Sequence, residues 1–222
     1  MVRSMGAKRA CARGFTLIEA SLAIVIVGVA VLALVEAQSS FLRTNAWSTQ
    51  SATGTYLANE IRELSRTFTR HDPVTSIWVE TDGSSSILRG WGPEAGELSS
   101  ADFDDLDDLD GLRFGEGGNQ AGPIDGFGNV IPQLNPDGTV ELDSQGNPVP
   151  MRGWSQEVRV EKVDPFNNSL VRDKSYLVAA VPPDFPGRAV DGFPLRVTVI
   201  VRYRGDFDPE ALEMARVVWI VP

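Results

Sequence analysis

One apolar run near the start of the chain predicts a helix long enough to cross a lipid bilayer. Residues 15–35 read FTLIEASLAIVIVGVAVLALV, and Glu19 is the one charged residue among these 21. An α-helix rises about 1.5 Å per residue, so the run extends over about 30 Å, which matches the hydrocarbon thickness of a bilayer. Lipid offers the backbone no hydrogen-bond partners, and a single spanning segment therefore forms a helix.

After this run the pattern becomes amphipathic. Leu57, Ile61, Leu64 and Phe68 recur at intervals of three or four residues and define one apolar helix face. We therefore predict one long helix over about residues 16–70, whose second half packs on a globular domain. Pro73 closes this segment, and Gly54 is a weak point within it.

Beyond Pro73 the pattern predicts β-structure. Leu195, Val197 and Val199 alternate with polar residues, as in a half-buried strand. Residues 92–150 are rich in loop signals and show no internal repeat. The expected fold is α+β, with a long N-terminal helix packed on a C-terminal antiparallel β-sheet that carries loop-rich insertions. Strands are predicted at 76–80 and 86–91 around an Asp82-Gly83 turn, and at 155–163, 195–203 and 213–222.

The charge of the chain is distributed unevenly. The formal net charge is −10, which argues against nucleic-acid binding because phosphate contacts need a basic surface. Residues 1–14 nevertheless carry four basic residues and no acid, namely Arg3, Lys8, Arg9 and Arg13. A basic segment ahead of a membrane helix stays in the cytoplasm, so we expect the C-terminal domain to cross the membrane.

Glu19 is a functional candidate, because a carboxylate inside a bilayer costs at least a few kcal/mol. The stretch RGFTLIEASLAIVIVGVAVLAL that contains it resembles the class III signal of type IV pilins and of the pseudopilins of type II secretion. In that family a short basic leader ends in glycine and is followed by phenylalanine, a few apolar residues and glutamate. Gly14, Phe15 and Glu19 match these positions.

The resemblance implies a processing and assembly route. A prepilin peptidase would cut between Gly14 and Phe15 on the cytoplasmic side and would methylate the new amine of Phe15. Glu19 would pair with the N-terminal amine of a neighbouring subunit in a filament. Many pilins have a helix-bending proline where this chain has Glu36, so we expect a straighter helix here. The predicted parts are a leader at 1–14, an assembly and transmembrane segment at 15–38, an amphipathic helical segment at 39–72 and a β-rich globular domain at 73–222.

An acidic stretch, ADFDDLDDLDGLRF at residues 101–114, is the second candidate site. One hypothesis is a solvated acidic loop held by Phe103, Leu106 and Leu109, whose side chains enter the core. The other is a Ca²⁺ site, because Ca²⁺ prefers several oxygen ligands on a turning loop, although the spacing is not that of an EF-hand. The stretch also resembles a segment of minor pilins of the PilV and MSHA type. Its six aspartates are Asp102, Asp104, Asp105, Asp107, Asp108 and Asp110.

The sequence shows no catalytic constellation, and we do not expect an enzyme. The single histidine, His71, is expected to be solvated near the helix C-terminus, where a positive charge suits the helix dipole. The single cysteine, Cys11, lies in the basic leader, so the body has no disulfide or thiol nucleophile. The serines lack a nucleophile elbow, and the glycine-rich segment 115–129 lacks the context of a phosphate loop. Apart from the Ca²⁺ hypothesis, no cofactor is expected.

The sequence therefore predicts a minor pilin-like structural subunit of a type IV pilus. Its expected partners are a prepilin peptidase, other pilin or pseudopilin subunits, an inner-membrane assembly platform and the lipid bilayer. It is expected in the bacterial inner membrane, crossing once, with a cytoplasmic N-terminus and a periplasmic C-terminal domain, and then in a filament or at the cell surface. Two alternatives remain open, a minor pseudopilin of a type II secretion system and an extracytoplasmic binding domain on an ordinary signal anchor.

Overall fold

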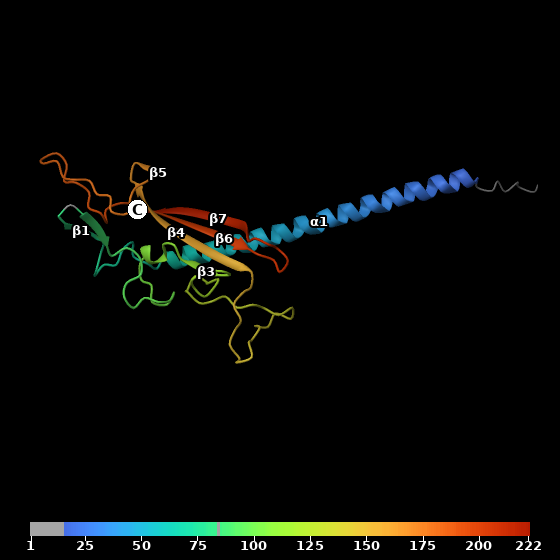
Figure 1. The fold of residues 1–222 in the computed structure, drawn as a ribbon, viewed down its shortest axis with the longest axis horizontal. Helices are drawn as coiled ribbons and strands as arrows, with labels where there is room; N and C mark the ends of the chain where they lie inside the picture. The colour runs from blue at the N-terminus through green and yellow to red at the C-terminus, as the bar shows by residue number, and fades with distance from the viewer. Residues whose placement is uncertain (1–15, 84) are drawn as a thin grey trace, which may run out of the picture. The chain divides into compact units, whose positions relative to one another are not determined.

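A computed structural model describes residues 16–83 and 85–222 of the chain (Figure 1). It divides into two compact units, one ending at Ser48 and one comprising Thr49–Pro222. A single helix, α1 (Leu17–Ser65), contributes to both units. The helix ends at Ser65 rather than near residue 70, because the hydroxyls of Ser65 and Thr67 donate to the carbonyls of Arg62 and Leu64, each at 2.7 Å. Such local bonds replace the next helical turn.

In the first unit the apolar side chains of α1 are exposed. Leu17 is 87 % exposed, and the exposure continues along the helix to Val35. Within the described residues, α1 is a helix long and apolar enough to span a membrane. A continuous apolar surface of this kind is stable only where lipid or protein covers it.

The second unit contains an antiparallel sheet and a separate hairpin, which confirms the predicted α+β architecture. The sheet order is β3-β4-β6-β7, and β5 pairs with the end of β4. In Figure 1 the strands β4, β6 and β7 lie side by side, next to the C-terminal part of α1. The elements are β1 (Trp78–Asp82), β2 (Ser85–Arg89), a 3₁₀ turn η1 (Asp107–Leu109), β3 (Arg113–Gly115), β4 (Trp154–Asp164), β5 (Asn167–Val171), β6 (Leu195–Tyr203) and β7 (Leu212–Val221).

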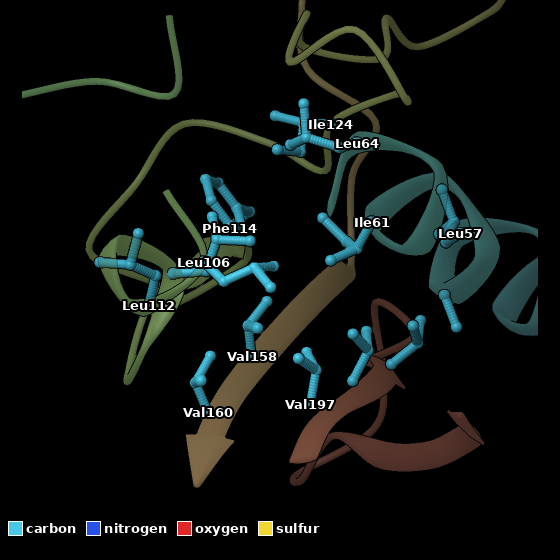
Figure 2. Packing of buried hydrophobic residues seen from close by; sticks show 14 of the residues in the cluster. Leu57, Ile61, Leu64, Leu106, Leu112, Phe114, Ile124, Val158, Val160 and Val197 are labelled. Atoms are coloured by element: carbon cyan, nitrogen blue, oxygen red, sulfur yellow. The ribbon is translucent and has the colours of Figure 1, made fainter. Parts of the chain in front are cut away.

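The core forms between α1 and the sheet, and the predicted apolar stripe of the helix takes part in it. Leu57 and Ile61 are fully buried and Leu64 nearly so, while Phe68 lies beyond the end of α1 and is partly buried. Strand β6 is central and is buried on both faces, because Thr198 and Ile200 are covered as well as the residues that alternate with them. Figure 2 shows side chains of the helix, the sheet and the loop segments meeting in one cluster, among them Leu57, Ile61, Leu64, Leu106, Leu112, Phe114, Ile124, Val158, Val160 and Val197.

Gly54 has a packing role that the sequence did not reveal. A Cβ atom at this position would lie 2.9 Å from Cβ of Met214 in β7, which is closer than real side chains approach. The absence of a side chain therefore allows α1 to come close to β7. The weak point predicted in the helix is a contact point between helix and sheet.

The loop-rich segment contains a repeat, so the expectation of no internal repeat was wrong. Three five-residue turns start at Asp125, Asn135 and Asp143, and each follows the pattern Asp/Asn-x-x-Gly-Asn/Thr. In each turn the first residue's backbone N–H bonds the carbonyl of the fifth, and the glycine N–H bonds the carbonyl of the first. The repeat is only five residues long and irregularly spaced, which is why periodicity did not expose it.

A buried amide joins the helix, the sheet and this segment. Gln156 on β4 is fully buried. Its Nε2 donates to the carbonyl oxygens of Leu57 at 2.8 Å and of Ile124 at 3.0 Å, and its Oε1 accepts from the Ile124 N–H at 2.7 Å. All the polar atoms of this side chain are thus used, and three distant parts of the chain share one hydrogen-bonded centre.

Replacing this amide should destabilise the body strongly. Gln156→Leu leaves the N–H and carbonyl of Ile124 without their partner in the core, and each buried unpaired group costs about 1–3 kcal/mol. We expect a loss of about 3 kcal/mol in the free energy of unfolding, measured by urea denaturation of the full chain in detergent micelles with tryptophan fluorescence. The control is Gln120→Leu, whose side chain is partly exposed and makes one long bond of 3.5 Å to Leu98. An equal loss in both variants would contradict the role assigned to Gln156.

A buried lysine lies further along the same face of β4. Lys162 is fully buried, and its Nζ donates to the carbonyl oxygens of Lys174 and Tyr176, the second at 3.4 Å. The ammonium group also lies 5.5 Å from the ring centroid of Phe193. Burial lowers the pKa of Lys162 to about 8, although Asp173, Asp191 and Asp107 act in the opposite direction.

This lysine should make the stability of the protein rise with pH in the alkaline range. Between a folded pKa of about 8 and the ordinary value of 10.5, the unfolded chain binds a proton that the folded chain does not. We therefore expect the free energy of unfolding to increase from pH 8 to pH 10, by up to about 3 kcal/mol from this group. Lys162→Met should lack this component, so the difference between the two proteins isolates it from tyrosine ionisation. Identical pH profiles for wild type and Lys162→Met would rule the effect out.

Candidate functional site

The assembly candidate lies at the start of α1. Gly14 and Phe15 fall outside the described residues, whereas Glu19 lies in the first turn of the helix and is exposed. The N–H of Glu19 donates to Oγ1 of Thr16 at 3.3 Å, so Thr16 caps the helix. Thr-x-x-Glu is the pattern of a capping box, in which the glutamate also supports the first turn. Glu19 therefore has a local role that must be separated from any role in assembly.

The second candidate site lies beside the end of α1. The backbone of Thr69 accepts from Leu106 N–H at 3.0 Å and donates to the Asp104 carbonyl at 3.4 Å, which ties the acidic stretch to the residues that follow the helix. Phe103, Leu106 and Leu109 are 5 %, 1 % and 0 % exposed. The apolar anchoring of this stretch is thus confirmed.

Three of its aspartates have their oxygens bound by donors of the protein. Asp102 is exposed and accepts from the hydroxyl and N–H of Ser99. Asp107 is fully buried, with Oδ1 bound to His71 and Oδ2 to the Gly92 N–H. Asp110 accepts from the Val160 N–H, the indole of Trp91 and the ammonium of Lys174. These three side chains have their own partners and do not face a common point.

Asp105 and Asp108 form a reciprocal pair. Oδ1 of Asp105 accepts from the N–H groups of Asp107 and Asp108, and Oδ2 of Asp108 accepts from those of Asp104 and Asp105. Both residues are almost completely buried, at 1 % and 0 % exposed. Oδ2 of Asp105 and Oδ1 of Asp108 are buried without a hydrogen-bond partner.

Two glutamates outside the predicted stretch complete the cluster. Glu94, Asp105 and Asp108 each place a carboxylate oxygen within 4.8 Å of the other two. Glu97, Asp104 and Asp108 form a second such group, so Asp108 belongs to both. Glu94 and Glu97 could not be identified from the sequence, because they precede the stretch and reach it through a loop whose path only the fold determines.

The cluster is strongly perturbed electrostatically. Burial and the neighbouring carboxylates raise the pKa of Asp105 to about 8 and that of Glu94 to about 7. Burial also raises the pKa of Asp108 to about 6. Three carboxylates held this close cannot all stay ionised near neutral pH unless a cation compensates their charge; without one, protons bind. The hypothesis of a merely solvated acidic loop is therefore wrong for Asp105 and Asp108.

His71 is another correction. It was expected to be solvated, but it is 8 % exposed, and its Nδ1 lies 2.6 Å from Oδ1 of Asp107. The ring also contacts Trp91, with centroids 5.9 Å apart. The chain turns back after α1 and brings the acidic stretch over this residue, which a local reading of the helix end cannot show. Nε2 of His71 is buried without a hydrogen-bond partner among the described residues.

Comparison with known proteins bears on the N-terminal candidate. No curated protein and no solved structure matches the chain. Residues 9–35 match the family model described as the prokaryotic N-terminal methylation motif, and this range includes Phe15 and Glu19. The chain therefore carries the N-terminal methylation motif of prokaryotes, the class III signal of type IV pilins, and the matched range includes the first part of α1, a helix long and apolar enough to span a membrane.

Proposed function

We propose that the chain is a minor pilin-like structural subunit that is processed by a prepilin peptidase and incorporated into a type IV pilus. The observation that carries this proposal is the methylation motif at residues 9–35, which supports a pilin-like or pseudopilin precursor. The long α1 and the antiparallel sheet packed on its second half support the same reading. The long loop-rich segment between β2 and β4 favours a minor subunit, because a filament built mainly of such bodies would have to accommodate it at every position.

The proposed topology follows from the charges near the membrane segment. Four basic residues and no acid precede it, so the N-terminus stays in the cytoplasm and the body is periplasmic. The inner membrane then holds the subunit until an assembly platform transfers it to the filament. Since the apolar side chains of α1 from Leu17 to Val35 are exposed, neighbouring subunits can replace lipid around them.

Glu19 is proposed to guide this assembly. Its carboxylate is exposed in the first helical turn, and within residues 16–83 and 85–222 no ion pair involves it. Cleavage after Gly14 would create an amine on Phe15, and the amine of a neighbouring subunit would neutralise Glu19 in an apolar bundle. A charge pair in such surroundings is costly to break once it has formed, because the remaining charge would be left uncompensated.

The role is proposed to be structural rather than catalytic. The His71–Asp107 pair resembles part of a catalytic set, but a nucleophile would have to lie within hydrogen-bond distance of the free ring nitrogen. Nε2 of His71 has no such partner in the described residues. The pair instead links the segment after α1 to the acidic stretch.

The first test is the mature N-terminus. In cells with a prepilin peptidase, mass spectrometry should find a chain that begins at Phe15 with a methylated amine. Deleting the peptidase should leave residues 1–14 in place. A wild-type chain that retains Met1, or one cut near Ala37, would contradict the proposal and favour an ordinary signal anchor or signal peptide.

The second test separates the charge of Glu19 from its capping role. Glu19→Gln retains a side chain suited to the capping box but has no charge. If assembly needs the charge, the Gln variant should insert into the membrane and be processed, but its amount in sheared filament fractions should fall about tenfold or more, as expected when about 1.4 kcal/mol or more of pairing energy is lost.

The matched control is Thr16→Val, which removes the capping hydroxyl and keeps Glu19. This variant should lose about 1 kcal/mol of helix stability but should still enter filaments. Normal incorporation of Glu19→Gln, with a defect in Thr16→Val, would show that the glutamate serves only the helix. If Glu19→Gln instead impairs protein export by type II secretion and leaves pilus fractions unchanged, the chain has the alternative role, that of a minor pseudopilin of type II secretion.

A further inference from the structure

We propose that Glu94, Asp105 and Asp108 form a Ca²⁺ site that fastens the loop after β2 to the end of α1. From the sequence alone, the six aspartates of the acidic stretch suggested a Ca²⁺ site. The structure selects a different set of ligands, in which two of those aspartates combine with a glutamate from a separate loop. This proposal does not depend on the function proposed above.

The distances suit one cation. A carboxylate oxygen from each of the three residues lies within 4.8 Å of the other two. Two oxygens that bind the same Ca²⁺ at about 2.3–2.6 Å are separated by no more than about 5 Å, so one ion can bind all three. Water and the nearby Glu97 and Asp104 can supply the remaining oxygens that Ca²⁺ requires.

The hydrogen-bond pattern points to the same ligand. Glu94, Asp105 and Asp108 are the acidic residues with a buried carboxylate oxygen that has no hydrogen-bond partner in the described chain. Asp105 is 1 % exposed and Asp108 is 0 % exposed, so each is at least 99 % buried. A buried acceptor without a donor is costly, and groups of this kind in a native protein call for an ion or a proton.

The backbone holds the pair of aspartates in place for this purpose. The second oxygen of each side chain is occupied by two N–H groups of the turn at residues 104–108. These bonds orient both carboxylates, so the free oxygens are preorganised rather than mobile. Glu94 comes from the loop after β2, where Thr75 donates to its Oε1 at 3.4 Å and its own N–H donates to Oε2 of Glu97.

Charge balance favours a divalent ion over protons alone. A carboxylate oxygen from each of the three residues lies within 4.8 Å of the other two, and Asp105 and Asp108 are almost fully buried, so three ionised groups here repel one another strongly without compensation. A divalent cation neutralises two of the three charges and lets all three groups ionise. Ca²⁺ is preferred to Mg²⁺ because it accepts six to eight oxygens in an irregular shell, whereas Mg²⁺ needs a compact octahedron and retains its water.

The site would add a link between segments that Trp91 and Gly92 already tie together through Asp110 and Asp107. Glu94 follows β2, Asp105 precedes η1 and Asp108 lies within it, and the same turn is hydrogen-bonded to Thr69 beyond the end of α1. A bound ion therefore closes the loop at residues 91–98 onto the helix end. We infer that Ca²⁺ stabilises this end of the body.

The test uses the full chain in detergent micelles, first freed of metal with a chelator. Isothermal titration with CaCl₂ should show one high-affinity site per chain. At free Ca²⁺ about a hundredfold above the dissociation constant, the melting temperature should rise by about 5 °C or more. MgCl₂ at the same concentration should give a much smaller rise, and NaCl at matched ionic strength should give only a graded screening effect.

Asp108→Asn gives a prediction of opposite sign in the two states. The amide oxygen still accepts from the turn's N–H groups, and the amide nitrogen can donate to the other carboxylates. Without metal this variant should therefore melt above wild type, because repulsion is relieved. With Ca²⁺ it should melt below wild type, and its affinity should fall about tenfold or more, because one charged ligand is gone.

Asp102→Asn is the matched control. Asp102 belongs to the same acidic stretch but is exposed and bonds Ser99, outside the cluster. It should retain the full response to Ca²⁺. Equal effects of CaCl₂ and MgCl₂, no heat of binding, or an equal loss of response in Asp102→Asn and Asp108→Asn would each overturn the proposal.

Discussion

Gln156 lies where α1, β4 and the first turn of the loop-rich segment meet, and its side chain binds the backbone of the other two. On β4 it lies on the same face as Trp154, Val158 and Val160, so it occupies a position that the strand pattern assigns to the core. An unpaired amide there would be unfavourable, and only the joint arrangement of Leu57 and Ile124 satisfies it. The hydrophobic core supplies most of the stabilisation, but this amide specifies how the helix and the loop segment dock on the sheet.

Buried charge is concentrated at the other end of the body. Lys162, Asp107 and the pair Asp105 and Asp108 lie in or near the segments that follow α1 and β4, and each is almost inaccessible. Carbonyl oxygens accept hydrogen bonds from Lys162, and His71 is the partner of Asp107. The cluster of Glu94, Asp105 and Asp108 has free oxygens left over. The proposed Ca²⁺ site lies at this one convergent group, whose open oxygens need an ion or a proton to compensate them.

Helix α1 serves two environments with one regular backbone. Toward its N-terminus every apolar side chain is exposed and only lipid or other subunits can cover it, whereas Leu57, Ala58 and Ile61 are fully buried in the body. Helical bonds satisfy the backbone in both settings, so no break is needed between them. The absence of a side chain at Gly54 allows a close approach to β7. In the proposed function, the same element thus carries the assembly signal at one end and positions the folded body at the other.

The sequence by itself determined the features that rest on short-range patterns. The apolar run, the helix stripe and the alternation in Leu195–Tyr203 depend on periodicity, and the methylation motif depends on residues only a few positions apart. The fold class followed from these. Tertiary structure alone decided what lies opposite each polar group. His71 meets Asp107 across 36 positions, Gln156 meets Leu57 across 99, and Glu94 reaches Asp105 and Asp108 through a loop. The sequence pattern indicates which residues prefer burial. The partner of a buried charge or amide depends on how distant segments pack, because the free-energy penalty for an unpaired polar group arises only in the folded core.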